Sequence, residues 1–158
     1  MHPPLPGQPV AHSTFNIART YPVAPARVFA AFADQATKRR WFAEGEGWEV
    51  DEFTVDFRVG GRETARFRFG DSAPMGNDTI YLDIVPDRRI VLAYTMTVGD
   101  ERHSVSLTTV ELAPTDDGTR LVYTEQGAFF DGVDDPVGRE RGCRELLERL
   151  AEELRAQE

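Results

Sequence analysis

The chain has 158 residues, of which 41% are hydrophobic and 28% charged, so it fits one globular domain with an apolar core and a solvated surface. Its net charge of −9 at pH 7 argues against nucleic acid and against an anionic membrane surface as partners, because both favour a basic face. The single cysteine, Cys143, excludes an internal disulfide, and no apolar run approaches the roughly 20 residues of a membrane span. The start of the chain lacks the apolar stretch of a secretory signal, so we expect a cytoplasmic protein.

Proline sets the predicted boundaries in the first part of the chain. Residues 1–11 are rich in proline and predict an irregular arm, followed by a single domain over residues 12–158. The alternating segment 12–21 predicts a first strand, which Pro22 ends because proline cannot donate to a strand ladder. Pro25 then suits the first turn of a helix, and Asp34 can cap a second short helix.

The middle of the chain predicts about six antiparallel strands. They are expected at residues 48–57, 62–70, 78–85, 88–98, 103–112 and 119–130. The hydrophobic phase slips between Val50 and Phe53, which predicts a bulge or a bend. The last four of these segments read as two hairpins.

A final helix is predicted over residues 136–155. Asp135 can cap it, and Pro136 suits its first position. Its apolar stripe is formed by Cys143, Leu146, Leu147, Leu150 and Leu154. Consecutive strands followed by one long helix indicate the α+β class, with helices on one face of an antiparallel sheet.

Several segments resemble a known family. The stretch "PVAPARVFAAFADQATKRRWF" (22–42) is similar to the start of the activator-of-Hsp90-ATPase-homologue-1-like proteins of the START/polyketide-cyclase superfamily. "DFRVGGRETARFRF", "IVPDRRIVLAYTM" and "GTRLVYTEQGAFF" resemble their later strands in the right order, so the resemblance covers about residues 13–155. It implies a helix-grip fold: a curved antiparallel sheet of about six or seven strands wrapped around the C-terminal helix, with two short helices after the first strand and an apolar cavity inside. It implies no shared catalytic motif.

The sequence carries no strong metal, cofactor or nucleophile motif. His2, His12 and His103 are far apart, whereas a zinc site needs three or four converging ligands. Phosphate-binding, dinucleotide-binding and nucleophile-elbow motifs are absent, so we expect no cofactor and no metal. Cys143 falls on the apolar stripe, where a cysteine acts as a small hydrophobic residue.

We expect an apolar ligand pocket between the sheet and the last helix. Strand phase and the helix stripe give its predicted lining: Phe67, Phe69, Tyr94, Met96, Tyr123 and Leu146. Glu125 follows Tyr123 in the same phase and is expected at the polar end, unless the strand ends there and Glu125 meets solvent. Trp41, which ends the region of short helices, is expected near the mouth. Ordinary core packing is the alternative for most of these aromatic residues.

Three functions follow from these features. The first is a carrier or sensor that binds a small apolar or aromatic molecule, because the expected fold forms a cavity and catalytic clusters are missing. The second is a cyclase- or aromatase-type enzyme in which Tyr or Glu groups transfer protons, with Glu125 as the weak catalytic candidate. The third, suggested only by the family resemblance, is a co-chaperone of Hsp90. We expect a monomer or a homodimer.

Overall fold

The protein folds into one sheet that packs against a long helix. The structure is a computed structural model that describes residues 10–132 and 134–157. Its strands are β1 (Val10–Tyr21), β2 (Trp48–Val55), β3 (Arg62–Phe69), β4 (Met75–Val85), β5 (Arg89–Val98), β6 (Glu101–Thr115) and β7 (Gly118–Phe130). Its helices are α1 (Pro25–Ala33), α2 (Gln35–Lys38), the π-helix η1 (Arg39–Ala43) and α3 (Pro136–Ala156).

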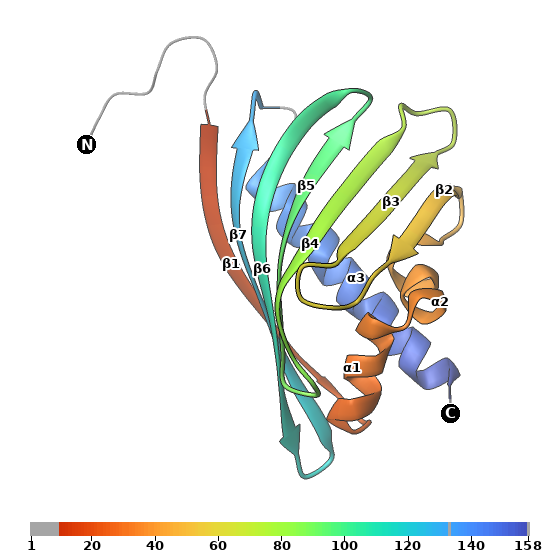
Figure 1. Cartoon of the computed structure of the whole chain (residues 1–158), viewed down its shortest axis with the longest axis vertical. Coiled ribbons are helices and arrows are strands. Elements are labelled where there is room, and N and C mark those ends of the chain that lie inside the picture. The colour runs from red at the N-terminus through yellow and green to blue at the C-terminus, as the bar shows by residue number, and fades with distance from the viewer. Residues whose placement is uncertain (1–9, 133, 158) are drawn as a thin grey trace, which may run out of the picture.

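All neighbouring strands pair antiparallel, in the spatial order β1-β7-β6-β5-β4-β3-β2. Figure 1 shows the sheet curving around α3, which crosses one face diagonally, while α1 and α2 lie near the C-terminal end of that helix. The predicted α+β helix-grip fold is confirmed. The bulge predicted between Val50 and Phe53 is also confirmed, because the β2–β3 register shifts between Val50 and Glu52.

The structure describes only the last two residues of the arm predicted over residues 1–11. Residues 1–9 lie outside the described residues, and Val10 and Ala11 already belong to β1. The division of the chain at residue 12 therefore stays a prediction. Within the described ranges, no helix is both long enough and apolar enough to cross a membrane.

Proline and aspartate position the short helices as expected. Pro25 occupies the first turn of α1, where its missing N–H leaves no helical bond unmade. The side chain of Asp34 accepts a hydrogen bond from the Thr37 backbone N–H at 2.9 Å and thereby caps α2. Trp41 on η1 then packs edge-on against Phe32 of α1, with 5.0 Å between ring centroids. The short helices thus close one end of the space between the sheet and α3.

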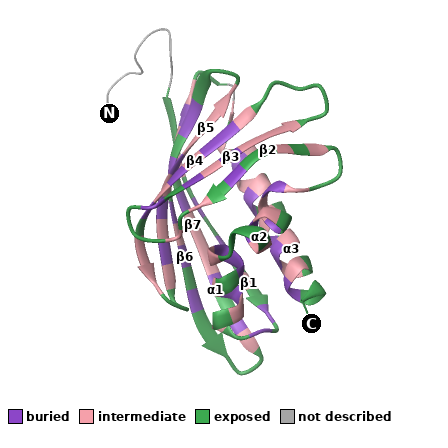
Figure 2. Cartoon of the chain, turned by 45° about the vertical axis from the view of Figure 1, so that its right-hand side comes forward, coloured by how far each residue is buried: buried purple, intermediate pink, exposed green. Residues whose placement is uncertain are grey.

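Helix α3 buries its predicted stripe against the concave face. Leu147, Leu150 and Leu154 are almost completely buried, and Leu146 is half-buried. Figure 2 shows buried and exposed residues alternating along α3. Direct hydrogen bonds also anchor its C-terminal half: the Tyr21 hydroxyl donates to the Leu147 carbonyl at 3.0 Å, and Arg40 binds Glu153 at 2.9 Å. Apolar packing and polar clamps therefore hold this half of the helix.

Replacing Leu150 with alanine tests this packing. Because Leu150 has no exposed surface, we expect Leu150→Ala to lower the free energy of unfolding by roughly 2–5 kcal/mol in urea melts. Val137 lies on the same helix and is 69% exposed, so Val137→Ala is the control and should change stability by no more than about 0.5 kcal/mol. Equal, small effects for both variants would show that α3 is not packed as described.

Candidate functional site

The concave face carries a buried carboxylate. Glu125 lies on β7 beneath α3 and is only 1% exposed. Its Oε1 atom accepts hydrogen bonds from the hydroxyls of Tyr94 at 2.8 Å, Tyr123 at 3.0 Å and Thr108 at 3.2 Å. The three donors come from strands β5, β7 and β6. The carboxylate is thus surrounded by hydroxyl groups rather than by solvent.

Arg139 reaches the same place from the first turn of α3. Its Nη1 donates to the Tyr94 hydroxyl at 2.9 Å and to Ser106 Oγ at 3.3 Å, and it lies 3.5 Å from Glu125 Oε2. Its Nη2 donates to Ser104 Oγ at 2.7 Å and to the Asp134 carboxylate. The guanidinium therefore links α3 to three strands of the sheet.

Two aromatic rings flank this guanidinium. Its central carbon lies 5.5 Å from the Tyr94 ring centroid and 5.1 Å from that of Phe129, distances at which a cation is attracted to a ring. Burial alone would lower the pKa of Arg139, but Tyr94 and Asp134 hold that pKa above its ordinary value. Arg139 is consequently a permanent buried cation.

Strand alternation explains why these polar groups meet. Ser104, Ser106 and Thr108 share the inner face of β6, so the intervening Val105 and Leu107 point outward and are exposed. The register then places Ser106 opposite Tyr94 and Thr108 opposite Glu125. The inward side of β6 is therefore polar at this level of the sheet.

Burial raises the pKa values of the two tyrosines and the cysteine in this cluster. Desolvation raises the pKa of Tyr94 and of Tyr123 well above the ordinary value for a phenol; the next cause is Glu125 for Tyr94 and Cys143 for Tyr123. Desolvation, followed by the charge of Glu125, also raises the pKa of Cys143 to about 12. All three groups are therefore protonated at neutral pH.

A second buried charge pair lies across the same face. Lys38 of α2 and Glu63 of β3 are both almost fully buried, with 2.6 Å between Nζ and Oε1. The Tyr81 hydroxyl donates to the same Glu63 oxygen at 2.6 Å. Because Glu63 pairs with Thr79, and Thr79 with Tyr94, a polar row joins the two charge pairs across strands β3 to β5.

The structure brings together only part of the predicted site. Tyr94, Tyr123 and Glu125 share one hydrogen-bond network. Met96 and Leu146 are half-buried and pack against the same core cluster. The assignment of these residues to a ligand stays a prediction.

The remaining three predicted residues take no part in this hydrogen-bond network. Trp41 is buried in the same core cluster as Met96 and Leu146 and donates its indole N–H to the Ala31 carbonyl at 2.9 Å. Phe67 is half-buried and packs against a separate small cluster around Phe53, and Phe69 is 49% exposed. Phe67 and Phe69 both contact Trp48 at the β2–β3 end of the sheet. Phe67 and Phe69 lie outside the polar cluster because strand phase fixes a face but not a position along it.

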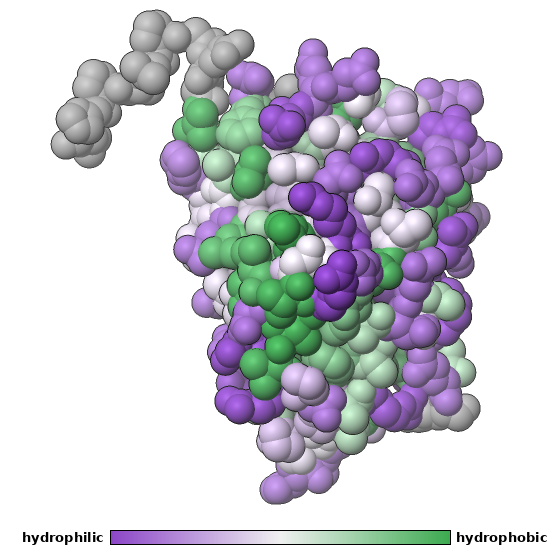
Figure 3. All heavy atoms as spheres, viewed as in Figure 1, coloured by the Kyte–Doolittle hydropathy of each residue, from purple (hydrophilic) through white to green (hydrophobic). Residues whose placement is uncertain are grey.

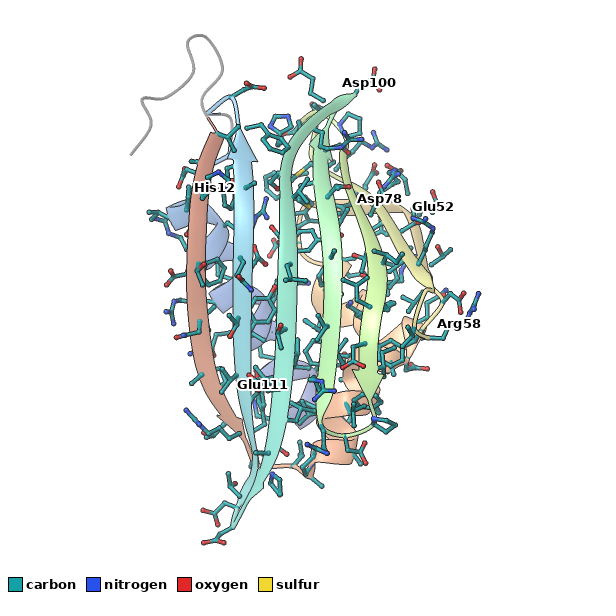
Figure 4. All side chains as sticks on the ribbon, turned by 60° about the vertical axis from the view of Figure 1, so that its left-hand side comes forward. His12, Glu52, Arg58, Asp78, Asp100 and Glu111 are labelled. Atoms are coloured by element: carbon teal, nitrogen blue, oxygen red, sulfur yellow. The ribbon has the colours of Figure 1, made fainter. Side chains whose placement is uncertain are left out.

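Two surface hollows stand out in residues 10–132 and 134–157, and both lie outside the space between the sheet and α3. One, of about 560 Å³, lies on the outer face of the sheet beside His12 of the edge strand β1 (Figure 4). The exposed Val105 and Leu107 contribute to it, and Figure 3 shows hydrophobic residues gathered on this side of the molecule. The other, of about 410 Å³, lies between η1 and α3 and is lined largely by charged residues. Side chains pack the region around Glu125.

Sequence reasoning missed Arg139, although the sequence contains a signal for it. Arg139 precedes Cys143 by four residues and so continues the apolar stripe of α3 as a charged residue. The inward serines of β6 were missed because Val105 and Leu107 alternate with them and favour the opposite face. No group of three or more His, Cys, Asp or Glu side chains within the described ranges is arranged to hold a metal ion.

Comparisons with known proteins give one family. The family model for activator of Hsp90 ATPase homolog 1-like protein matches residues 22–155. The solved Mll3558 protein of Rhizobium loti is 60% identical with a TM-score of 0.85, over 91% of this chain and 98% of that one. A putative uncharacterized protein of Rhizobium leguminosarum is 38% identical with a TM-score of 0.90, over 94% and 98%.

A more distant solved structure shows the same fold. The AHSA1 protein of Silicibacter pomeroyi is 23% identical with a TM-score of 0.75, over 92% of this chain and 100% of that one. At this identity the likeness concerns the fold alone. No curated protein matches the chain.

Removing Arg139 tests the buried ion pair. We expect Arg139→Met to lower the free energy of unfolding by roughly 3–5 kcal/mol, because it leaves Glu125 buried without its cation. Adding Glu125→Gln should restore part of this loss in a double-mutant cycle. The control is Arg141→Met, at an exposed position of the same helix. Equal effects of the two arginine variants in urea melts would contradict the description.

The raised pKa of Cys143 gives a test by thiol labelling. With a pKa of about 12 rather than the ordinary 9.0, the native thiol holds far less thiolate at about pH 8 than an unfolded chain does. We expect a thiol reagent to react at least about a hundredfold more slowly with the native protein than with the urea-unfolded protein. Above pH 9 only the unfolded thiol ionises, so stability should also fall between pH 9 and 12. Rapid labelling of native protein would rule out this environment.

Proposed function

The chain belongs to the activator of Hsp90 ATPase homolog 1-like family, and from this membership and its buried polar cluster we propose that it binds one small, mainly apolar molecule between the sheet and α3. The observation that carries the proposal is the Glu125–Arg139 pair beneath the first turns of α3. Burying two charges there costs free energy, and well-packed apolar residues often serve stability as well or better. A role in recognising a ligand accounts for polar groups at this position.

The surroundings of the cluster suit a ligand with an apolar body. Met96 of β5 and Leu146 of α3 are half-buried, pack against the same core cluster as Tyr94 and Tyr123, and offer apolar contact area. The ring of Tyr123 adds an aromatic surface, stacked at 6.5 Å on Phe15. A molecule bound here has its polar end at Glu125 and its apolar part along these side chains.

Entry of the ligand requires the N-terminal half of α3 to move outward, because side chains fill this region in the structure. The contacts of the helix favour motion at that end. Its first turn is joined to the sheet through Arg139, whereas Leu147, Leu150 and the clamp at Tyr21 hold the C-terminal half. Polar contacts can be exchanged for contacts with a ligand, whereas separating the leucines from the sheet exposes apolar surface.

The same groups support a binding protein better than a cyclase-type enzyme. Such an enzyme would need a tyrosine or a carboxylate that exchanges protons near neutral pH. Both Tyr94 and Tyr123 donate their protons to Glu125, and desolvation raises the pKa of each well above the ordinary range. The cytoplasmic location and the monomeric or homodimeric state expected from the sequence stay predictions.

Titration with a neutral, environment-sensitive dye such as Nile red tests this function. We expect saturable binding, and we expect Met96→Ala on the inner face to weaken it about fivefold, since about 1 kcal/mol of apolar contact is lost. The matched control is Leu107→Ala, which removes an apolar side chain from the outer hollow. If Leu107→Ala weakens the dye and Met96→Ala does not, the dye binds outside the sheet. That result, or the absence of binding, would overturn the proposal.

A further inference from the structure

We infer that the buried end of this site takes an uncharged hydroxyl group, so that the ligand is an alcohol or a phenol rather than a carboxylic acid or an amine. This inference rests on the ligand-binding function proposed above. It comes from counting which hydrogen-bonding groups around Arg139 and Glu125 are already engaged. The count leaves one acceptor and one donor, both close to Arg139 Nη1.

The acceptor is the second oxygen of Glu125. Oε1 already accepts from three hydroxyls, whereas Oε2 has a single contact, at 3.5 Å, with Arg139 Nη1. That nitrogen carries two hydrogens but has three acceptors within reach, and the other two, Tyr94 and Ser106, lie closer. A buried carboxylate oxygen normally has firmer partners. Glu125 Oε2 is therefore the atom that gains most from a new donor.

The donor is the hydroxyl of Ser106. Its Oγ accepts from Arg139 Nη1 at 3.3 Å, which leaves its own proton to donate. No side-chain or backbone acceptor for that proton is found in residues 10–132 and 134–157. Ser106 Oγ and Glu125 Oε2 lie 3.3 Å and 3.5 Å from the same Nη1 atom, so they are close neighbours. A ligand hydroxyl that enters between them when the N-terminal half of α3 moves outward donates to Glu125 and accepts from Ser106.

Charged ligand groups fit this position less well. A carboxylate would meet the Glu125 carboxylate, and the Arg139 guanidinium is already shared among Tyr94, Ser104, Ser106 and Asp134. An ammonium that reached Glu125 Oε2 would lie next to the buried guanidinium, which is 3.5 Å from the same oxygen. An ether could accept from Ser106 but would leave Oε2 without a donor.

A matched set of naphthalenes tests the inference on the wild-type protein. The probes are 2-naphthol, 2-methoxynaphthalene, 2-naphthoate and 2-naphthylmethylammonium, each competing with Nile red at neutral pH. We expect 2-naphthol to bind about tenfold or more tightly than each of the others, since it alone supplies a neutral donor to a charged acceptor. If the ether or either charged probe competes as well as 2-naphthol while Nile red binding persists, the hydroxyl inference is wrong and the binding function stands. Absence of Nile red binding would instead overturn the binding function.

Two carboxylate variants then test whether Glu125 causes the tighter binding of 2-naphthol. Glu125→Gln keeps an acceptor for the three hydroxyls but puts an NH₂ group where Oε2 was, so the advantage of 2-naphthol over its methyl ether should disappear. Glu63→Gln is the matched control, because Glu63 is an equally buried carboxylate on the same face, paired with Lys38. It should keep the advantage of 2-naphthol. A preference that survives Glu125→Gln, or is lost in Glu63→Gln, would contradict the assignment to Glu125.

Discussion

The buried pair of Glu125 and Arg139 determines how the last helix meets the sheet. Neither charge can be left alone in an apolar interior, because an unpaired buried charge costs several kcal/mol (about 3–5 when one partner is removed). The guanidinium must therefore lie over β5, β6 and β7, where its acceptors are. This requirement sets the position of the first turn of α3, and the leucine stripe behind it sets the rest.

The two ends of α3 are consequently held by different forces. The C-terminal half buries leucines, and its contact with the sheet depends on apolar area. The N-terminal half is joined through the hydrogen bonds of Arg139 and buries a single apolar residue, Cys143. The outward movement of α3 proposed above would expose the inner face of the sheet at this end and keep the leucine contacts. This asymmetry is the structural basis of the binding function proposed for the site.

The two charge pairs on the concave face differ in geometry, and we infer different roles for them. Lys38 and Glu63 tie α2 to β3, with the Lys38 ammonium 4.8 Å from the Phe42 ring centroid and the Tyr81 hydroxyl on the carboxylate. That pair is compact, with a single 2.6 Å contact, and it fixes the short helices. Glu125 and Arg139 are looser, at 3.5 Å, and share a larger set of hydroxyls. The looser pair has the unused hydrogen-bonding capacity that recognition of a ligand needs.

The sequence by itself determined the elements and the fold class, because proline positions, the Asp34 and Asp135 caps, strand alternation and the leucine stripe are local patterns. It also determined that Tyr123 and Glu125 share a face, since side chains two residues apart in a strand do so. Tertiary structure alone decided that Arg139 meets Glu125, that β6 turns its serines inward, that Phe67 packs in another cluster, and that Phe69 is exposed. The physical reason is that burial of a polar group is settled by partners from other strands and from α3, and a pattern along one segment carries no information about them.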